Sequence, residues 1–227
     1  MNKNLAGRLF AGLFTLFFGL NACLNNKTDK QPDIFLDYQI NAREGDDKLS
    51  ILLQFRDAAT GDAFELKPPS EVRLDQETLR PDSTLKKNCF YELYKPIDSF
   101  TGKHAIIYTD LNHKIFRQQF EFRPFSLSVP IPDTIGRDSL MLDFSGLSAD
   151  DRISFILTDT AFSNDDINRT VPPGVRKITL TSGDLGNLSA GPLQIEFIRE
   201  TRIPFIKPGL QGGLQVNYSL KREVYLK

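Results

Sequence analysis

The chain has 227 residues, and its 28 lysines and arginines nearly balance its 29 aspartates and glutamates, which gives a formal net charge of −1. Charge this close to neutral argues against the basic patch or stripe that nucleic-acid binding requires, so no nucleic-acid partner is expected. The chain has only two cysteines, Cys23 and Cys89, which excludes a fold held together by several disulfides.

The first 22 residues have the zones of a secretory signal. Lys3 and Arg8 make a short positive start, and the apolar run Leu9–Leu20 follows over 12 residues. A membrane-spanning helix needs about 20 apolar residues, whereas a run of this length is typical of the apolar region of a signal peptide. Residues 1–22 are therefore expected to be a cleaved signal peptide.

The cleavage site carries a more specific signal. Ordinary signal peptidase favours small residues at positions −1 and −3, but the candidate −3 residue, Leu20, is bulky. The segment Leu20-Asn21-Ala22-Cys23 resembles the lipobox of bacterial lipoproteins, from which only Asn21 departs. This resemblance implies lipid on Cys23 and a lipid-anchored place in the cell envelope. Leu24 and not Asp follows the cysteine, and this resemblance therefore favours the outer membrane, on either of its faces. The alternative is that the segment is not cleaved and itself serves as the anchor.

Residues 24–35 are mostly polar and show no periodicity, so residues 23–35 are interpreted as the lipidated cysteine and a flexible tether. Removal of residues 1–22 takes away Lys3 and Arg8 and no acid, which changes the net charge from −1 to −3. If Cys23 carries lipid, Cys89 has no intramolecular disulfide partner. No base lies near Cys89 in the sequence, so a buried apolar thiol is expected there.

Beyond the tether, apolar and polar residues alternate with a period of two. This pattern is typical of strands that have one face on a core and one in water, and no window has helical spacing, so the chain is predicted to be all-β. The sets expected to face the core are Tyr38, Ile40 and Ala42; Ile51, Leu53 and Phe55; Val72 and Leu74; Phe116, Phe120 and Phe122; and Leu214, Val216, Tyr218, Leu220, Val224 and Leu226.

Turn residues separate these runs at short intervals, which is typical of sandwiches and barrels. The segments His104–Thr109 and Ile115–Phe122 are predicted to pair as an antiparallel hairpin, since only Asp110–Lys114 lies between them. Other predicted turns are Thr60-Gly61-Asp62, Pro68-Pro69, Pro172-Pro173-Gly174 and Gly212-Gly213.

The two parts of the chain on either side of Pro124–Asp133 end alike. In the first part, a strand, a turn and a last strand follow the segment Phe100-Thr101-Gly102-Lys103. In the second part, a strand, a longer connection and a last strand follow the segment Leu188-Ser189-Ala190-Gly191. This layout resembles the final strands of immunoglobulin-like sandwiches, in which the loop before the penultimate strand packs an apolar residue under the sheet. We therefore expect two tandem immunoglobulin-like antiparallel β-sandwich domains, at 36–125 and 126–227. One larger sandwich or barrel is the alternative.

Few residues suggest chemistry. The two histidines, His104 and His113, are expected to be exposed and too far apart on their hairpin to share a metal ion. No serine-nucleophile, phosphate-loop or zinc-protease motif occurs, and no cofactor is expected. Asp159, Asp165 and Asp166 lie in an oxygen-rich segment that calcium favours, but the spacing does not match an EF-hand, and Asp and Asn are also common turn residues.

These observations predict a non-enzymatic, membrane-anchored lipoprotein of the cell envelope that acts as a binding or structural module. Its membrane contact is the lipid on Cys23, and its further partner is an envelope protein or a glycan, with no ligand-binding residues assigned. Fold class alone does not assign function, so two alternatives stay open. One is an accessory subunit that packs into an envelope assembly through a sheet edge, and the other is a glycan hydrolase that uses paired carboxylates.

Overall fold

The computed structural model describes residues 33–82, 89–159 and 166–227. Almost all of the regular structure in these ranges is β-strand, and the only helices are one turn of 3-10 helix and one five-residue α-helix. None of the described helices has the length and apolar character required to cross a membrane.

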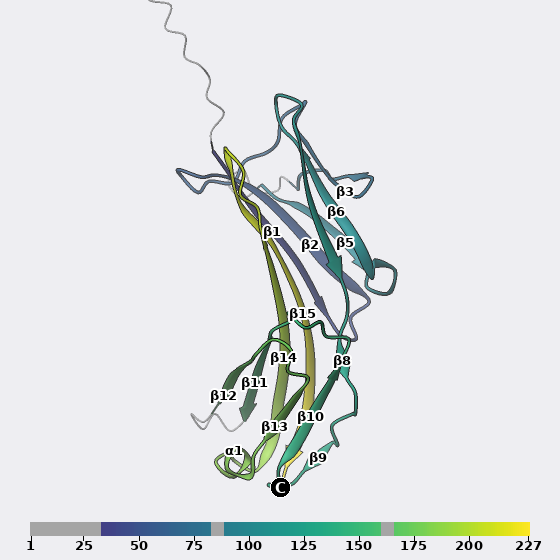
Figure 1. Cartoon of the computed structure of the whole chain (residues 1–227), viewed down its shortest axis with the longest axis vertical. Helices are drawn as coiled ribbons and strands as arrows, with labels where there is room; N and C mark the ends of the chain where they lie inside the picture. Colours follow the sequence, from purple (N-terminus) through teal and green to yellow (C-terminus); the bar gives the residue numbers. More distant parts are fainter. Residues whose placement is uncertain (1–32, 83–88, 160–165) are drawn as a thin grey trace, which may run out of the picture. The chain divides into compact units, whose positions relative to one another are not determined.

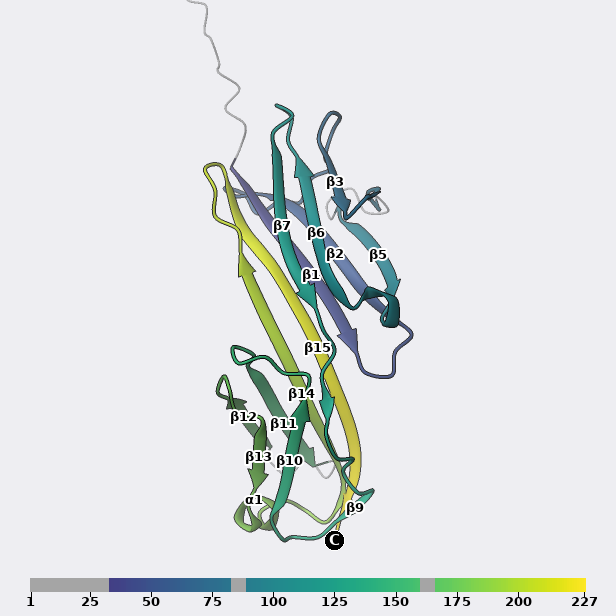
Figure 2. The same ribbon diagram turned by 45° about the vertical axis from the view of Figure 1, so that its right-hand side comes forward.

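The first half of the fold is a two-layered sandwich (Figure 2). One layer has the strand order β1-β2-β5 and the other has the order β4-β3-β6-β7. Phe55 of β2 joins the layers, since its ring centroid lies 5.0 Å from the ring centroid of Tyr108 in β6. The elements are β1 (Ile34–Arg43), β2 (Lys48–Asp57), β3 (Glu71–Leu74), β4 (Glu77–Thr78), β5 (Tyr91–Pro96), η1 (Asp98–Phe100), β6 (Gly102–Thr109) and β7 (Ile115–Phe122).

The second half repeats this arrangement. Its layers have the strand orders β8-β10-β13 and β12-β11-β14-β15. The two layers are joined by Phe144 of β10 and Phe197 of β14, whose ring centroids lie 5.1 Å apart. The elements are β8 (Ser126–Leu127), β9 (Thr134–Ile135), β10 (Leu140–Ser145), β11 (Ile153–Asp159), β12 (Ile167–Val171), β13 (Lys177–Leu180), α1 (Ser182–Gly186), β14 (Gly191–Pro204) and β15 (Leu210–Leu226).

Both halves have the topology of an immunoglobulin-like sandwich. In the letters conventionally used for the strands of immunoglobulin domains, strands A, B and E form one layer of each half. Strands C, F and G form the other layer, with an added C′ strand. The short β9 runs parallel to the last strand, β15. The predicted all-β fold of tandem immunoglobulin-like sandwiches is therefore confirmed.

The core-facing residues are also as predicted. All the residues of the expected sets are buried except Phe116, which is half-buried. The predicted hairpin is present, with β6 and β7 paired antiparallel from Gly102↔Phe122 to Thr109↔Ile115.

The segments before the penultimate strands match each other closely. η1 precedes β6 and ends at the buried Phe100, and α1 precedes β14 and is followed by the buried Leu188. The strands then begin at Gly102 and Gly191, whose φ angles are +132° and +137°. Helix α1 has only five residues, which is too short to show helical periodicity in the sequence, and a capping box with Thr181 begins it.

The C-terminal hairpin β14–β15 belongs to both halves (Figure 1). The second part of β15 pairs within the second sandwich, whereas Leu210–Ser219 pairs in parallel with the whole of β1. One eight-stranded sheet therefore has the order β12-β11-β14-β15-β1-β2-β5, with β9 paired to β15.

The predicted turn at Gly212-Gly213 and the longer connection before the last strand are wrong. β14 continues to Pro204, and the turn lies at residues 205–209. A Cβ at Gly212 would clash with the carbonyl oxygen of Leu36. Glycine is needed there because β1 approaches closely, and β1 is too distant in the sequence for local patterns to reveal this contact.

Candidate functional site

A straight row of hydrogen-bonding side chains crosses five strands of the large sheet. The registers pair Glu200 with Asn217, Asn217 with Asn41, Asn41 with Ser50, and Ser50 with Tyr94. We call these five residues the polar row. Neighbouring strands lie about 4.8 Å apart, so the row is about 19 Å long.

The strand alternation directs the polar row away from the core. Ile40 and Ala42 flank Asn41 in β1, Val216 and Tyr218 flank Asn217 in β15, and all four flanking residues are buried. Because successive side chains in a strand point to opposite faces, Asn41 and Asn217 lie on the outer face. The sheet thus fixes the spacing of these side chains without any loop.

Several side chains of the row are held by hydrogen bonds. The Nδ2 of Asn217 donates to the Oδ1 of Asn41 over 2.8 Å, and the Nε2 of Gln215 donates to the Oδ1 of Asn217 over 3.2 Å. At the other end, the hydroxyl of Tyr94 donates to Glu92 over 2.6 Å, and this bond raises the pKa of Tyr94. The Tyr94 residue is 55% exposed, so its ring is open to a ligand.

The polar row lies in a shallow hollow of about 540 Å³. The charges in its lining are mixed, with two basic and three acidic side chains: Arg43, Lys48, Asp46, Glu196 and Glu200. Glu196 and Glu200 are four residues apart on β14, which places their Cα atoms about 13 Å apart. Glycosidases hold their two carboxyl groups about 5 Å or about 6.5–9.5 Å apart, and a Cα separation by itself does not identify such a pair.

The calcium candidates are not brought together in the described residues. Asp159 is buried at the end of β11, and its Oδ2 accepts a hydrogen bond from the backbone N–H of Ser189 over 3.1 Å. Asp166 is exposed, and Asp165 lies outside the described residues. Within the described ranges, no group of three His, Cys, Asp or Glu side chains could hold a metal ion.

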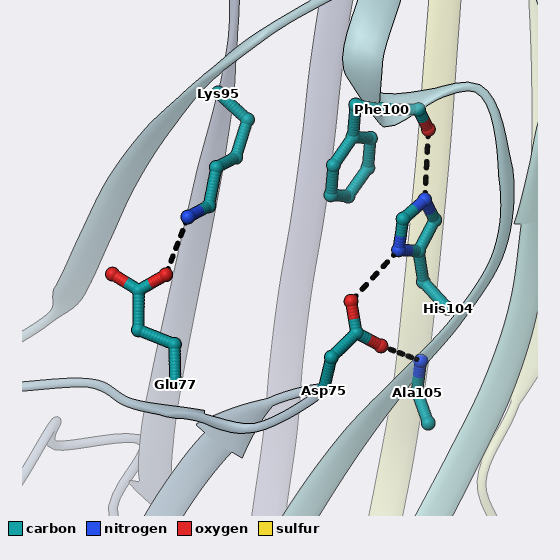
Figure 3. Close-up of polar contacts among 6 residues, drawn as sticks. All are labelled: Asp75, Glu77, Lys95, Phe100, His104 and Ala105. Atoms are coloured by element: carbon teal, nitrogen blue, oxygen red, sulfur yellow. Dashed lines mark hydrogen bonds and ion pairs between the residues drawn. The ribbon is translucent and has the colours of Figure 1, made fainter.

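The expectation that His104 is an exposed surface residue is wrong. Its Nε2 donates to the carbonyl oxygen of Phe100 over 2.8 Å, and its Nδ1 lies 2.9 Å from Asp75 (Figure 3). The ring stacks on Phe100 with centroids 3.8 Å apart, and the other oxygen of Asp75 accepts from the backbone N–H of Ala105. His104 therefore joins β6 to η1 and to the segment after β3. His113 is exposed in the β6–β7 turn, as expected.

Figure 3 also shows the ion pair between Lys95 of β5 and Glu77 of β4, which links the two layers beside this histidine. Cys89 is buried, and burial raises the pKa of its thiol, so this sulfur is held as a protonated apolar group. The proposed lipidation residue Cys23 and the recognition residues Leu20, Asn21 and Ala22 lie outside the described residues.

Comparison with known proteins gives distant structural similarity only. No family model and no curated protein matches the chain. Among solved structures, the two-domain DIP-gamma IG1+IG2 is 10% identical, with 86% of this chain and 97% of that chain covered and a TM-score of 0.24. The Yersinia pseudotuberculosis adhesin InvE is 10% identical, with coverages of 85% and 58% and a TM-score of 0.22. The Bacteroides ovatus mixed-linkage glucan protein SGBP-B is 12% identical, with coverages of 81% and 46% and a TM-score of 0.22.

Each of the two bacterial chains is longer than the part that this chain covers. TM-scores this low leave the strand topology as the basis for the fold assignment and carry no argument about function.

Proposed function

We propose that this chain is a non-enzymatic, lipid-anchored protein of a bacterial cell envelope that binds a glycan along the polar row. The register that aligns Asn41 and Asn217 with the exposed ring of Tyr94 supports this proposal most directly. Amide side chains both donate and accept hydrogen bonds, as sugar hydroxyls do. A tyrosine ring offers an apolar face with a polar edge, which suits the apolar and polar sides of a sugar ring.

The charges favour a neutral glycan over an anionic polymer. Acidic side chains outnumber basic ones in the hollow, and the whole chain has a formal net charge of −1. A polyanion would require a surplus of basic side chains at its site.

The anchor in this proposal is the lipid on Cys23, preceded by the recognition residues Leu20, Asn21 and Ala22. Mass spectrometry of the protein extracted from bacterial membranes tests it. The expected mass is that of residues 23–227 with a diacylglycerol group and an acyl chain. A mass equal to the unmodified chain would contradict the anchor and leave the glycan proposal standing.

Glycan-array screening followed by calorimetry tests the binding. Asn41→Ala, Asn217→Ala and Tyr94→Ala are each expected to weaken the affinity for the selected glycan about 10-fold, which corresponds to about 1.4 kcal/mol. The matched control is Tyr225→Ala, because Tyr225 is 51% exposed and lies outside the hollow. Equal losses in Tyr94→Ala and Tyr225→Ala would contradict the polar row as the site.

An assay for new reducing ends tests the non-enzymatic part of the proposal. No new ends are expected when the selected glycan is incubated with excess protein. Any new reducing ends would overturn this part, and their loss in Glu196→Gln or Glu200→Gln would identify these carboxylates as catalysts.

A further inference from the structure

The end of the first sandwich at which β1 begins exposes apolar side chains on three separate segments. Ile206 in the β14–β15 turn is 79% exposed, and Ile115 at the start of β7 is 63% exposed. Phe35 near the start of β1 and Leu111 in the β6–β7 turn are also exposed. We call these four residues the entry face.

Contacts between their neighbours hold the three segments together. The ring of Phe116, which follows Ile115, lies 6.2 Å from the ring of Phe205, which precedes Ile206. The backbone N–H of Ile34, which precedes Phe35, donates to the carbonyl oxygen of Gly209 over 2.9 Å. The β7 start, the β14–β15 turn and the β1 start are therefore neighbours.

An apolar groove of about 880 Å³ opens beside Phe35 and Ile206, two of the four residues of this face. Its lining includes Phe35, Ile203, Pro204, Ile206 and Pro208. Lys207 also lines the groove, and the ammonium of Lys114 lies 5.0 Å from the ring centroid of Phe116. The carboxylate of Asp37, which also lines the groove, forms an ion pair with the Nε of Arg56 over 3.5 Å. Apolar side chains with lysines at their rim are typical of surfaces that bind at a bilayer interface.

The chain length between Cys23 and the fold limits the distance of this face from a membrane. Ten peptide units separate Cys23 from Asp33, which spans at most about 35 Å when fully extended. The first strand, β1, begins at the entry face, since the backbone N–H of Ile34 is hydrogen-bonded to the β14–β15 turn. A lipid on Cys23 therefore keeps the start of β1, and with it the entry face, within about 35 Å of the bilayer.

We propose that the entry face lies on the bilayer that holds the lipid of Cys23, with Ile206 and Leu111 inserted at the boundary between headgroups and acyl chains. This inference rests on the lipid anchor of the proposed function and adds a second, non-covalent contact. The lipid on Cys23 fixes only the N-terminal end of the fold, so additional apolar contacts at the bilayer restrict the orientation of the fold.

Lipid quenching in vesicles tests this contact with the full, lipidated protein. A Cys89→Ala background leaves one reactive thiol after Ile206→Cys, which is labelled with an environment-sensitive fluorophore. The matched control is Met141→Cys, because Met141 of β10 is 64% exposed and lies outside the entry face. In phosphatidylcholine vesicles with doxyl-labelled lipid, emission at 206 is expected to fall about two-fold, with little change at 141.

Vesicle flotation separates this inference from the anchor. Protein that floats with vesicles but shows no lipid quenching at 206 would overturn the entry-face contact and leave the anchor standing. Protein that does not float would contradict the anchor itself. A blue shift at 206 without lipid quenching would show that a second copy covers the face, which would also overturn the bilayer contact. Quenching that is similar with and without phosphatidylglycerol would support apolar insertion, whereas quenching only with phosphatidylglycerol would overturn it.

Discussion

The guanidinium of Arg199 lies 3.6 Å from the carboxylate of Asp151, and these two side chains are only 5% and 11% exposed. The same guanidinium donates to the carbonyl oxygen of Arg123 and lies 5.5 Å from the ring centroid of Phe125. One buried cation on β14 thus holds both the segment after β7 and the loop before β11. Burial lowers the pKa of Arg199, because the charged form loses its hydration.

Removal of the counter-charge is expected to be costly. Asp151→Asn leaves the Arg199 cation buried without a carboxylate, and we expect the free energy of unfolding to fall by about 3 kcal/mol. Urea unfolding at neutral pH measures this change. The control is Glu223→Gln, which breaks the exposed pair with Lys221 and is expected to cost less than about 0.5 kcal/mol. Similar losses in the two variants would show that Asp151 does not compensate a buried charge.

Two buried tyrosines are expected to respond oppositely to loss of the hydroxyl. Tyr38 and Tyr91 both pack edge-on against Phe55, with centroid distances of 5.7 Å. The hydroxyl of Tyr91 accepts a hydrogen bond from the backbone N–H of Leu66 over 2.8 Å, whereas that of Tyr38 has no hydrogen-bond partner within the described ranges. Tyr91→Phe should lower the free energy of unfolding by about 1–2 kcal/mol, and Tyr38→Phe should raise it by about 1 kcal/mol. Urea unfolding measures both free-energy changes. Changes of the same sign would contradict the conclusion that the Tyr91 hydroxyl is hydrogen-bonded and the Tyr38 hydroxyl is not.

The ionisation of Tyr91 predicts a loss of stability in alkali. Burial raises the pKa of Tyr91 to about 12. The folded state therefore favours the neutral phenol, and this contribution is complete below the unfolded pKa of about 10. It is lost as the pH rises from about 10 to about 12. Unfolding free energies measured across this window should fall less steeply in Tyr91→Phe than in the parent protein, and identical slopes would exclude Tyr91 as a source.

The equivalent glycines at the penultimate strands should tolerate alanine poorly. Gly102 and Gly191 have φ angles of +132° and +137°, and no atom lies within 4 Å of a Cβ built at either position. The cost of Gly→Ala is therefore conformational and is expected to be about 1–3 kcal/mol at each site. Gly136→Ala is the control, because Gly136 has no positive φ and its Cβ would meet only Asp138 at 4.0 Å. Thermal unfolding that is equally affected in all three variants would argue against a backbone origin.

A chain that ends at residue 125 tests the role of the shared hairpin. Such a chain retains β1–β7 but lacks β15, so the N–H and C=O groups of β1 that pair with Leu210–Ser219 are left open. Open edges promote pairing between chains, and we expect this variant to self-associate more than the full chain in light-scattering measurements. A folded variant with no added association would show that residues 36–125 are self-sufficient; the division at 125 and 126 stays a prediction until then.

Local patterns were sufficient to predict the fold class and most of the core. The alternation in β1, β2 and β15 placed Ile40, Ile51 and Val216 in the core, because the side-chain period of a strand is fixed by its backbone. The matched loops at Phe100 and Leu188 indicated the repeat. The polar row was not predicted, although the alternation that placed Val216 and Tyr218 in the core directs Asn217 outward. The alignment of Asn217 with Asn41 depends on a contact across 176 residues.

The sequence by itself determined the alternating strands, the two similar ends of the halves and the lipobox-like segment at Cys23, since each depends on neighbouring residues. Only the tertiary structure decided that β15 serves both sandwiches, because parallel pairing with β1 is set by register and not by local composition. The same pairing brings Asn41, Asn217 and Tyr94 into one row and places Ile34 beside the β14–β15 turn. Both proposed surfaces therefore depend on a strand pairing that joins the two ends of the described chain.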